Sequence, residues 1–440
     1  MRLKSWLAAT AGLVGAVPGV AQTPAAYPTN FDVAPAGATA PGLPALTPPT
    51  KPGFCLPGEV CAPHSYLDGP AAGGAALPDF AGTAETRRPH TFWVNGEYLL
   101  WWSRSMGTPA LVTSVPNAQV GQAGVVGDKL FPVTRKIQFG PQNGVRVSGG
   151  VLLTDCYSLE GSFFQLETKV EGNTFFGSGL PGSAGLARPY VPADRGTAAV
   201  LLSATPGRYR GVVDVQPSTR LYGLDLNLGV DTFHLFSDHN RALYGFRFVD
   251  LAERLTVTDA STFPDGRVNT VQDVFATRNQ FYGGQVGLHS TFFGGQSWSF
   301  ETIGKFGFGG VRQHVEIFGA NANIDPAGVV DREAGGLLAR PSNSGMFERD
   351  KGAVTLDLTL TVGYQVTPRV RTTFGYSIFY LSSVVRPGGA IDRTVNDSAI
   401  RFVAPNDRTA STAARPTFDW GRSASDYWAQ GLNFGLTFGY

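Results

Sequence analysis

The chain has 440 residues, a formal net charge of +1 and 16% charged residues, beside 56 glycines, 30 phenylalanines and 14 tyrosines. This balance of charge gives no attraction to nucleic acid phosphates, so no nucleic-acid partner is expected. Beyond the N-terminus no run approaches the roughly 20 consecutive apolar residues of a transmembrane helix, which excludes a helical membrane protein. A soluble all-β protein and a membrane β-barrel remain, because a barrel alternates lipid-facing with lumen-facing residues.

Residues 1–21 have the pattern of a secretory signal peptide. Arg2 and Lys4 precede an apolar stretch, and the small residues Gly19 and Ala21 flank a suitable cleavage point. The apolar stretch is too short to span a membrane. The sequence therefore predicts export, with a mature chain that starts near Gln22.

Residues 22–90 are rich in Pro, Ala and Gly and hold few large apolar side chains. Such a segment cannot offset the entropy of ordering, so we expect a disordered periplasmic linker before the folded part, residues 91–440. Cys55 and Cys61 are spaced to close a small disulfide loop, which leaves Cys156 over. A metal site at these cysteines would have only His64 as a further ligand, so no metal or other cofactor is expected.

Past the linker, large apolar residues alternate with small or polar ones, the period of a β-strand whose faces meet different environments. In residues 220–231 the apolar side chains share one parity, while Asp225 and Asp231 share the other. Residues 353–366 repeat this pattern. Further strand-like stretches cover residues 92–105, 145–154, 157–167, 241–257, 271–293, 298–318, 369–384 and 427–440.

Short and long connections alternate strictly between these stretches. Outer-membrane barrels show this asymmetry, because their periplasmic turns are short and their extracellular loops are long. The expected fold is therefore all-β: a closed antiparallel transmembrane β-barrel of about ten strands with long extracellular loops. Residues 201–215 leave a twelve-strand alternative open, because they also read as a hairpin.

The chain ends in NFGLTFGY, which looks like the C-terminal signal that outer-membrane assembly machinery recognises. The residues that carry this likeness are the polar Asn433, Gly435, Phe438 and the terminal Tyr440. The pattern is short, but it gains weight at the end of an exported all-β chain.

Over residues 92–440 the chain resembles the BBP7 family of outer-membrane β-barrel porins. The carrying motifs are WVNGEYLLWWSRS, YSLEGSFF, YGFRFVDLAERL, TRNQFYGGQVG, GKFGFGGVRQ, FYLSSVVRPGGAIDRTVN and DYWAQGLNFGL. The resemblance implies a barrel in the cell outer membrane, surrounded by outer-membrane lipid and lipopolysaccharide and inserted by the assembly machinery. It implies a porin-like channel for passive passage of small solutes and leaves the oligomeric state open.

The inward parity carries charges of both signs. The expected lumen-lining residues are Glu97, Arg146, Glu160, Asp225, Asp231, Arg247, Glu253, Glu301, Lys305, Asp357 and Arg371, with the polar Asn279, Gln285 and Asn433. A ten-strand interior is close to the size that side chains can fill. These charges either line a narrow pore or pair into a plug, which would make the protein a structural or surface-binding barrel.

An outer-membrane hydrolase is a third and weaker reading. Among six histidines only His314, with Glu316 and Asp273, falls near the expected outer rim. No nucleophile motif or metal-ligand spacing accompanies them. We therefore expect no enzyme and no catalytic residues.

Overall fold

The structure is a computed structural model that describes residues 92–232, 239–292, 297–399 and 413–439. The predicted signal peptide and linker, Cys55, Cys61 and Tyr440 lie outside these residues. No helix in the described part is long and apolar enough to cross a membrane. Cys156 is disulfide-bonded, so the expectation that it is left over is wrong, because spacing along the chain does not show which cysteines meet.

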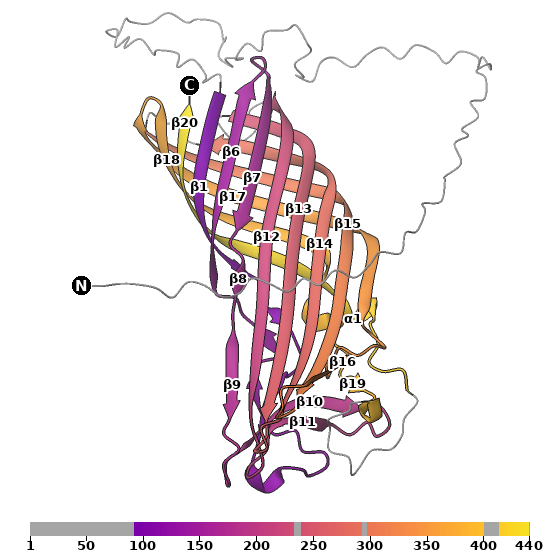
Figure 1. Cartoon of the computed structure of the whole chain (residues 1–440). Helices are drawn as coiled ribbons and strands as arrows, with labels where there is room; N and C mark the ends of the chain where they lie inside the picture. The colour runs from indigo at the N-terminus through magenta and orange to yellow at the C-terminus, as the bar shows by residue number, and fades with distance from the viewer. Residues whose placement is uncertain (1–91, 233–238, 293–296, 400–412, 440) are drawn as a thin grey trace, which may run out of the picture. The chain divides into compact units, whose positions relative to one another are not determined.

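Ten antiparallel strands form a closed ring in chain order (Figure 1). The ring consists of β1 (Phe92–Ser103), β6 (Pro141–Leu152), β7 (Tyr157–Leu166), β12 (Arg210–Thr232), β13 (His239–Thr262), β14 (Val268–Phe292), β15 (Trp298–Ile324), β17 (Gly345–Thr367), β18 (Val370–Val385) and β20 (Ala424–Gly439). The last strand pairs with the first, from Trp93 opposite Gly439 to Ser103 opposite Ala429. Closure leaves no unpaired sheet edge in the ring, as a membrane sheet requires.

All ten predicted strands are therefore present, and the twelve-strand alternative is wrong. Ala199–Ala204 forms β11, which pairs with β10 (Gly185–Pro192) in a separate sheet. Residues 210–215 begin β12 itself.

Short turns gather at one end of the barrel, here named the turn end, and long loops at the other, the loop end. At the turn end, residues 153–156 join β6 to β7 and residues 368–369 join β17 to β18. Residues 104–140, 167–209 and 386–423 make long connections at the loop end. The connection from β13 to β14 is shorter than expected, because pairing continues to Thr262 opposite Val268.

The alternation in the sequence corresponds to the two faces of the wall. Leu226 is 52% exposed on the outside, whereas its neighbour Asn227 is 2% exposed and faces inward. Leu358, on β17, is likewise exposed on the outside. The outward residues around these positions form an apolar band, as lipid contact requires.

The long loops fold into a small sheet of their own. Its strands run in the order β11, β10, β3 (Val112–Val115) and β4 (Asp128–Phe131), with β19 (Thr394–Val395) beside β10. These strands come from three different loops. The remaining elements are β2 (Met106–Gly107), η1 (Asn117–Gln119), β5 (Lys136–Ile137), β8 (Lys169–Val170), β9 (Asn173–Gly177), β16 (Val330–Ala334), η2 (Pro387–Ala390), η3 (Asp397–Ala399) and α1 (Trp420–Ser423).

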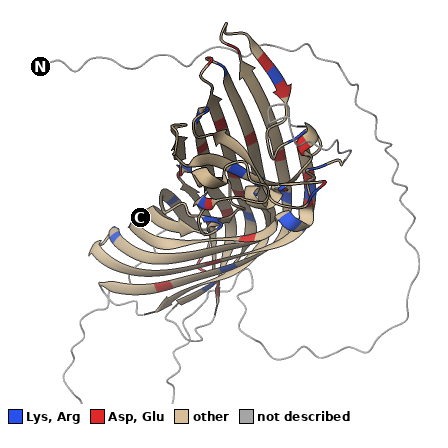
Figure 2. Ribbon diagram, turned by 90° about the horizontal axis from the view of Figure 1, so that it is seen from below, with Lys and Arg blue, Asp and Glu red and all other residues tan. Residues whose placement is uncertain are grey.

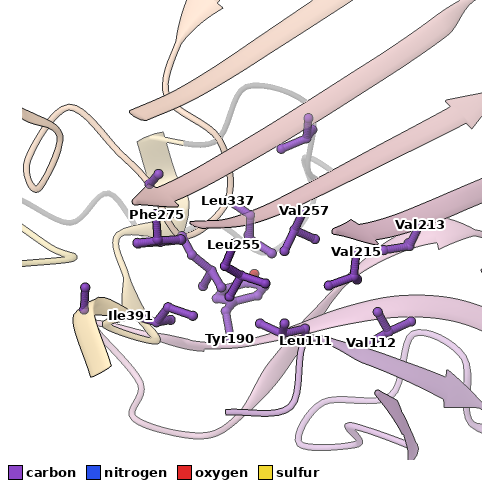
Figure 3. Close-up of a cluster of buried hydrophobic side chains, with 14 of the residues drawn as sticks. Leu111, Val112, Tyr190, Val213, Val215, Leu255, Val257, Phe275, Leu337 and Ile391 are labelled. Carbon is purple, nitrogen blue, oxygen red and sulfur yellow. The ribbon is translucent and has the colours of Figure 1, made fainter. Parts of the chain in front are cut away.

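The loop sheet and the wall share a hydrophobic core at the loop end (Figure 3). Val213, Leu255 and Phe275 point inward from β12, β13 and β14 and are fully buried. Leu111 and Tyr190 meet them from the loops, in one cluster. The described parts of these loops therefore pack into the end of the barrel.

Candidate functional site: the lumen

The eleven charged residues predicted to line the lumen all lie on the inward parity of their strands, and all are buried or half-buried. Figure 2 shows residues of both signs of charge on several strands of the ring. Asn227 and Gln285 meet beside them, since the Gln285 amide donates a 2.5 Å hydrogen bond to the Asn227 carbonyl oxygen. The inward parity of the sequence thus coincides with the inner face of the ring at these positions.

Ion pairs cross the lumen between strands that are not neighbours. Lys305 on β15 lies 3.0 Å from Asp225 on β12. Arg247 on β13, only 1% exposed, lies 2.5 Å from Asp357 on β17, and it also lies 3.7 Å from Asp225 on the neighbouring strand β12. Buried charges are tolerated when they are paired in this way. These contacts join strands that lie three positions apart in the ring, and their side chains take up lumen cross-section.

A second group lies where β1, β6, β18 and β20 meet. Glu97 and Arg146 form a 3.1 Å ion pair, and Arg146 also donates to the Ser377 hydroxyl. Asn433 accepts a 2.8 Å hydrogen bond from the Trp101 indole and donates to Ser377. Asn433, predicted as part of the assembly signal, therefore also has a packing role inside the barrel.

Near the turn end, Arg241 bridges Glu160 at 2.9 Å and Asp231 at 2.7 Å. Glu301 lies 2.5 Å from Arg371 and 3.5 Å from His289. Every charge predicted for this part of the lumen thus has a partner of opposite sign. The sequence predicted the acids but did not single out Arg241, whose pairing depends on cross-strand register.

Between these charges lies a cavity of about 450 Å³. Its lining runs from Arg369 and Gly439, at the turn end, to Phe164 deeper in the barrel. Eight of the eleven predicted residues line it: Glu97, Arg146, Glu160, Asp225, Glu301, Lys305, Asp357 and Arg371. The lumen therefore holds a polar vestibule that reaches the turn end.

An apolar layer lies next to this vestibule, on the side of the loop end. Trp101, Phe164 and Phe379 come from β1, β7 and β18. The ring centre of Phe164 lies 5.7 Å from that of Trp101 and 6.0 Å from that of Phe379. The other members are Leu99, Leu166, Leu221, Val249, Leu251, Phe281, Val311, Ala353, Leu381, Val384, Tyr427 and Ala429. Nine of the ten ring strands contribute, and all these side chains are buried. Along β13, the layer residues Val249 and Leu251 lie between Arg247 on the vestibule side and Glu253 on the side of the loop end.

Beyond the apolar layer, Arg386 fastens the loop after β18 to the barrel. Its guanidinium holds Glu253 of β13 through two hydrogen bonds of 2.6 and 2.8 Å. It also donates to the backbone carbonyls of Arg104 and Ser105, just after β1. Glu253 was predicted as a lumen residue, but Arg386 was missed because it lies in the sequence of a loop.

Two further ion-pair sites anchor the loops. Arg188 on β10 pairs at 2.5 Å with Asp273 on β14, and both side chains are buried. Asp392 accepts backbone hydrogen bonds from Thr394 and Thr417 and lies 3.2 Å from Arg422. Burial raises the pKa of Asp392, but these donors outweigh burial and hold the pKa below its ordinary value of 3.8.

The residues considered for a hydrolase do not come together. His314 and Glu316 face outward on β15, and His314 lies 3.0 Å from Glu348 on the neighbouring strand. Asp273 faces inward, where it binds Arg188 and the backbone N–H groups of Leu338 and Ala339. Within the described ranges, no group of three or more His, Cys, Asp or Glu side chains is placed to hold a metal.

A family model described as "Putative beta barrel porin-7 (BBP7)" matches residues 93–440. Comparison with curated proteins finds no match. Among solved structures, the outer membrane protease OmpT from Escherichia coli is similar over 80% of this chain and 98% of its own, with 9% identity and a TM-score of 0.36. The P. putida toluene transporter TodX is similar over 80% and 91%, with 9% identity and a TM-score of 0.21. Likeness at this level transfers neither substrate nor activity to this chain.

Proposed function

Since the chain belongs to the BBP7 family and is an outer-membrane β-barrel, we propose that it is a plugged barrel, which displays folded loops at the cell surface and does not conduct solutes in the described state. The observation that carries this proposal is the apolar layer around Trp101, Phe164 and Phe379. The proposal includes no catalytic activity.

The energetics of the layer support a closed lumen. An ion or sugar in transit would exchange its water shell for buried aromatic and aliphatic side chains that offer almost no hydrogen bonds. Transfer of even one uncompensated polar group into such surroundings costs roughly 2 to 7 kcal/mol, and an ion costs far more. The hydrophobic core at the loop end adds a second apolar barrier.

The orientation follows from the strand count and the turns. With an even number of strands, short turns and both ends of the barrel sequence belong on the periplasmic side. The vestibule would then open to the periplasm, and the loop sheet would face the cell exterior. In this arrangement the lumen is a cavity closed on the side of the cell surface.

A gated porin is the second candidate, favoured by the 450 Å³ vestibule. A channel of this kind would need the loops to leave the lumen, which requires the Arg386–Glu253 contact to break. Passive passage through the described state is not part of either proposal.

Single-channel recording in planar bilayers tests the plugged barrel. We expect purified wild-type protein to give no steady ohmic steps, and the variant Phe164→Ala with Phe379→Ala to give small steps because it opens the layer. Phe246→Ala, which truncates a lipid-facing side chain of similar size, is the control and should remain silent. Regular steps from wild-type protein would overturn the plugged barrel and support the porin.

A further inference from the structure

On five neighbouring strands the outward face changes from mainly apolar to mainly polar at a single row of register partners. That row consists of Tyr222, Asp250, Gln280, Arg312 and Asp350. On the side of the turn end, Leu224 and Tyr282 are exposed members of the apolar band. The headgroup region of the leaflet at the loop end must therefore begin near this row, because the band fixes where hydrocarbon ends.

Three arginines surround one alanine just beyond this row. Arg220 of β12 and Arg278 of β14 both lie opposite Ala252 of β13. Arg254 follows Ala252 by two residues, so it projects from the same face of the strand. Opposed Cα atoms in antiparallel strands are about 5 Å apart, which places Arg220 and Arg278 roughly 10 Å apart across a single methyl group. Long side chains can converge over this small residue.

The positive charge of this cluster is only partly balanced. Arg278 lies 2.7 Å from Asp250, whose side chain is fully buried beneath the surface. Arg254 lies 3.8 Å from Glu316, with both side chains substantially exposed. Three guanidinium groups are thus paired with only two carboxylates, and one of these carboxylates, that of Asp250, is buried.

Arg220 is the arginine that lacks an acidic partner within the described ranges. Its guanidinium lies 5.7 Å from the centre of the Tyr222 ring. Its Nε is buried and has no hydrogen-bond partner among the described side chains and backbone. The Arg220 guanidinium therefore retains hydrogen-bond donor capacity that no described residue uses.

We propose that Arg220, Arg254 and Arg278 bind the phosphate of an anionic lipid headgroup above Ala252. Guanidinium groups match phosphate in charge and in the spacing of their donors. The lipid source is favoured over free phosphate because acyl chains of the same molecule would lie on the apolar band, against Leu224 and its neighbours. This inference concerns the outer wall and does not depend on whether the lumen conducts.

The test measures binding of lipid A to the detergent-solubilised full chain, by titration of a fluorescent lipid A derivative. Arg278→Ala is avoided because it would leave Asp250 buried without its partner. Arg220→Ala and Ala252→Glu are used instead, since the second keeps all three arginines and fills the site with a carboxylate. We expect each to weaken binding by at least about tenfold, the loss of one charge-assisted contact.

Gln216→Glu adds the same charge farther out on β12 and is the matched control, which should bind as wild type does. Heat-modifiable gel mobility confirms that each variant is folded. Equal affinity of Ala252→Glu and wild type would overturn the proposal, as would equal binding of dephosphorylated lipid A. Competition by inorganic phosphate at the same concentration as the lipid would assign the site to free phosphate and reject the headgroup.

Discussion

At the residue scale, neighbouring positions on one strand meet opposite surroundings. Parity in the sequence was sufficient to place Leu226 outside and Asn227 inside. It could not show that Asn227 accepts a hydrogen bond from Gln285 of β14, because that contact depends on how the strands are placed around the ring. The sequence therefore predicted which way residues face but not how tightly the lumen is filled.

The substitution Leu226→Arg tests whether position 226 faces lipid on the outside of the barrel. A guanidinium on the lipid face near the bilayer midplane should cost roughly 2 to 4 kcal/mol, because it must reach the interface or draw water inward. Leu226→Arg should therefore sharply reduce folding yield into lipid vesicles. Ser148→Arg, which adds the same charge to the wall of the vestibule, is the control and should fold nearly as well as wild type. Equal yields for the two variants would contradict the facing.

Arg386 allows a second test at this scale. Arg386→Ala leaves the buried Glu253 carboxylate without its cation, and breaking such a pair typically costs roughly 3 to 5 kcal/mol. We expect a matching fall in the free energy of unfolding, measured by urea titration. Arg267→Ala breaks an exposed pair with Asp265, so its free energy of unfolding should stay close to that of wild type. A loss as small at Arg386 as at Arg267 would show that the loop is not fastened there.

At the element scale, strands were predicted best where they cross the apolar band. Within the band one face must be apolar, so alternation is strong in all ten strands. Residues 258–262 and 268–270 lie beyond the band, where both faces of the sheet carry polar side chains. Their sequence therefore shows no alternation of apolar and polar residues, although they are paired. The loop sheet was not predicted, because it unites strands from three loops that are far apart in sequence.

The last strand provides a prediction about assembly. Phe438 is 52% exposed on the outward face of β20 and lies opposite Val94 of β1, at the seam that closes the ring. Phe438→Ala combined with Tyr440→Ala should leave protein in the periplasm, degraded or aggregated, if the C-terminal signal drives assembly. Membrane yield and heat-modifiable mobility measure the effect. Normal values for both would refute the assignment.

Asp392 gives the loops a pH dependence. Its folded pKa lies below the unfolded value of about 3.9, so its stabilising contribution is complete above that value and fades as the pH falls through the folded pKa. Asp392→Asn should therefore speed proteolysis of the loops at pH 7. Unfolding by urea should differ between variant and wild type at pH 7 and converge at low pH. A difference that persists unchanged at low pH would exclude this carboxylate as the cause.

At the scale of the whole molecule, polar and apolar layers alternate along the lumen. The vestibule contains paired charges, the layer of Trp101, Phe164 and Phe379 follows, the Arg386–Glu253 contact lies beyond it, and the core shared with the loops comes last. The sequence alone did not decide between an open pore and a plugged lumen, because the inward parity holds both charged and apolar residues. Only the register shows that the apolar ones gather at two depths, in the layer and in the core at the loop end.

A plugged barrel in the proposed orientation has a lumen that is reached from the periplasm and is closed toward the cell surface. The most direct measurement is labelling of single cysteines, with native cysteines blocked or replaced, by a membrane-impermeant thiol reagent added to one side at a time. Thr373→Cys, in the vestibule, should react from the periplasmic side and not from outside, and Val249→Cys, in the apolar layer, should react from neither side. Labelling of Thr373→Cys from outside intact cells would show a continuous path through the barrel and contradict the plugged lumen.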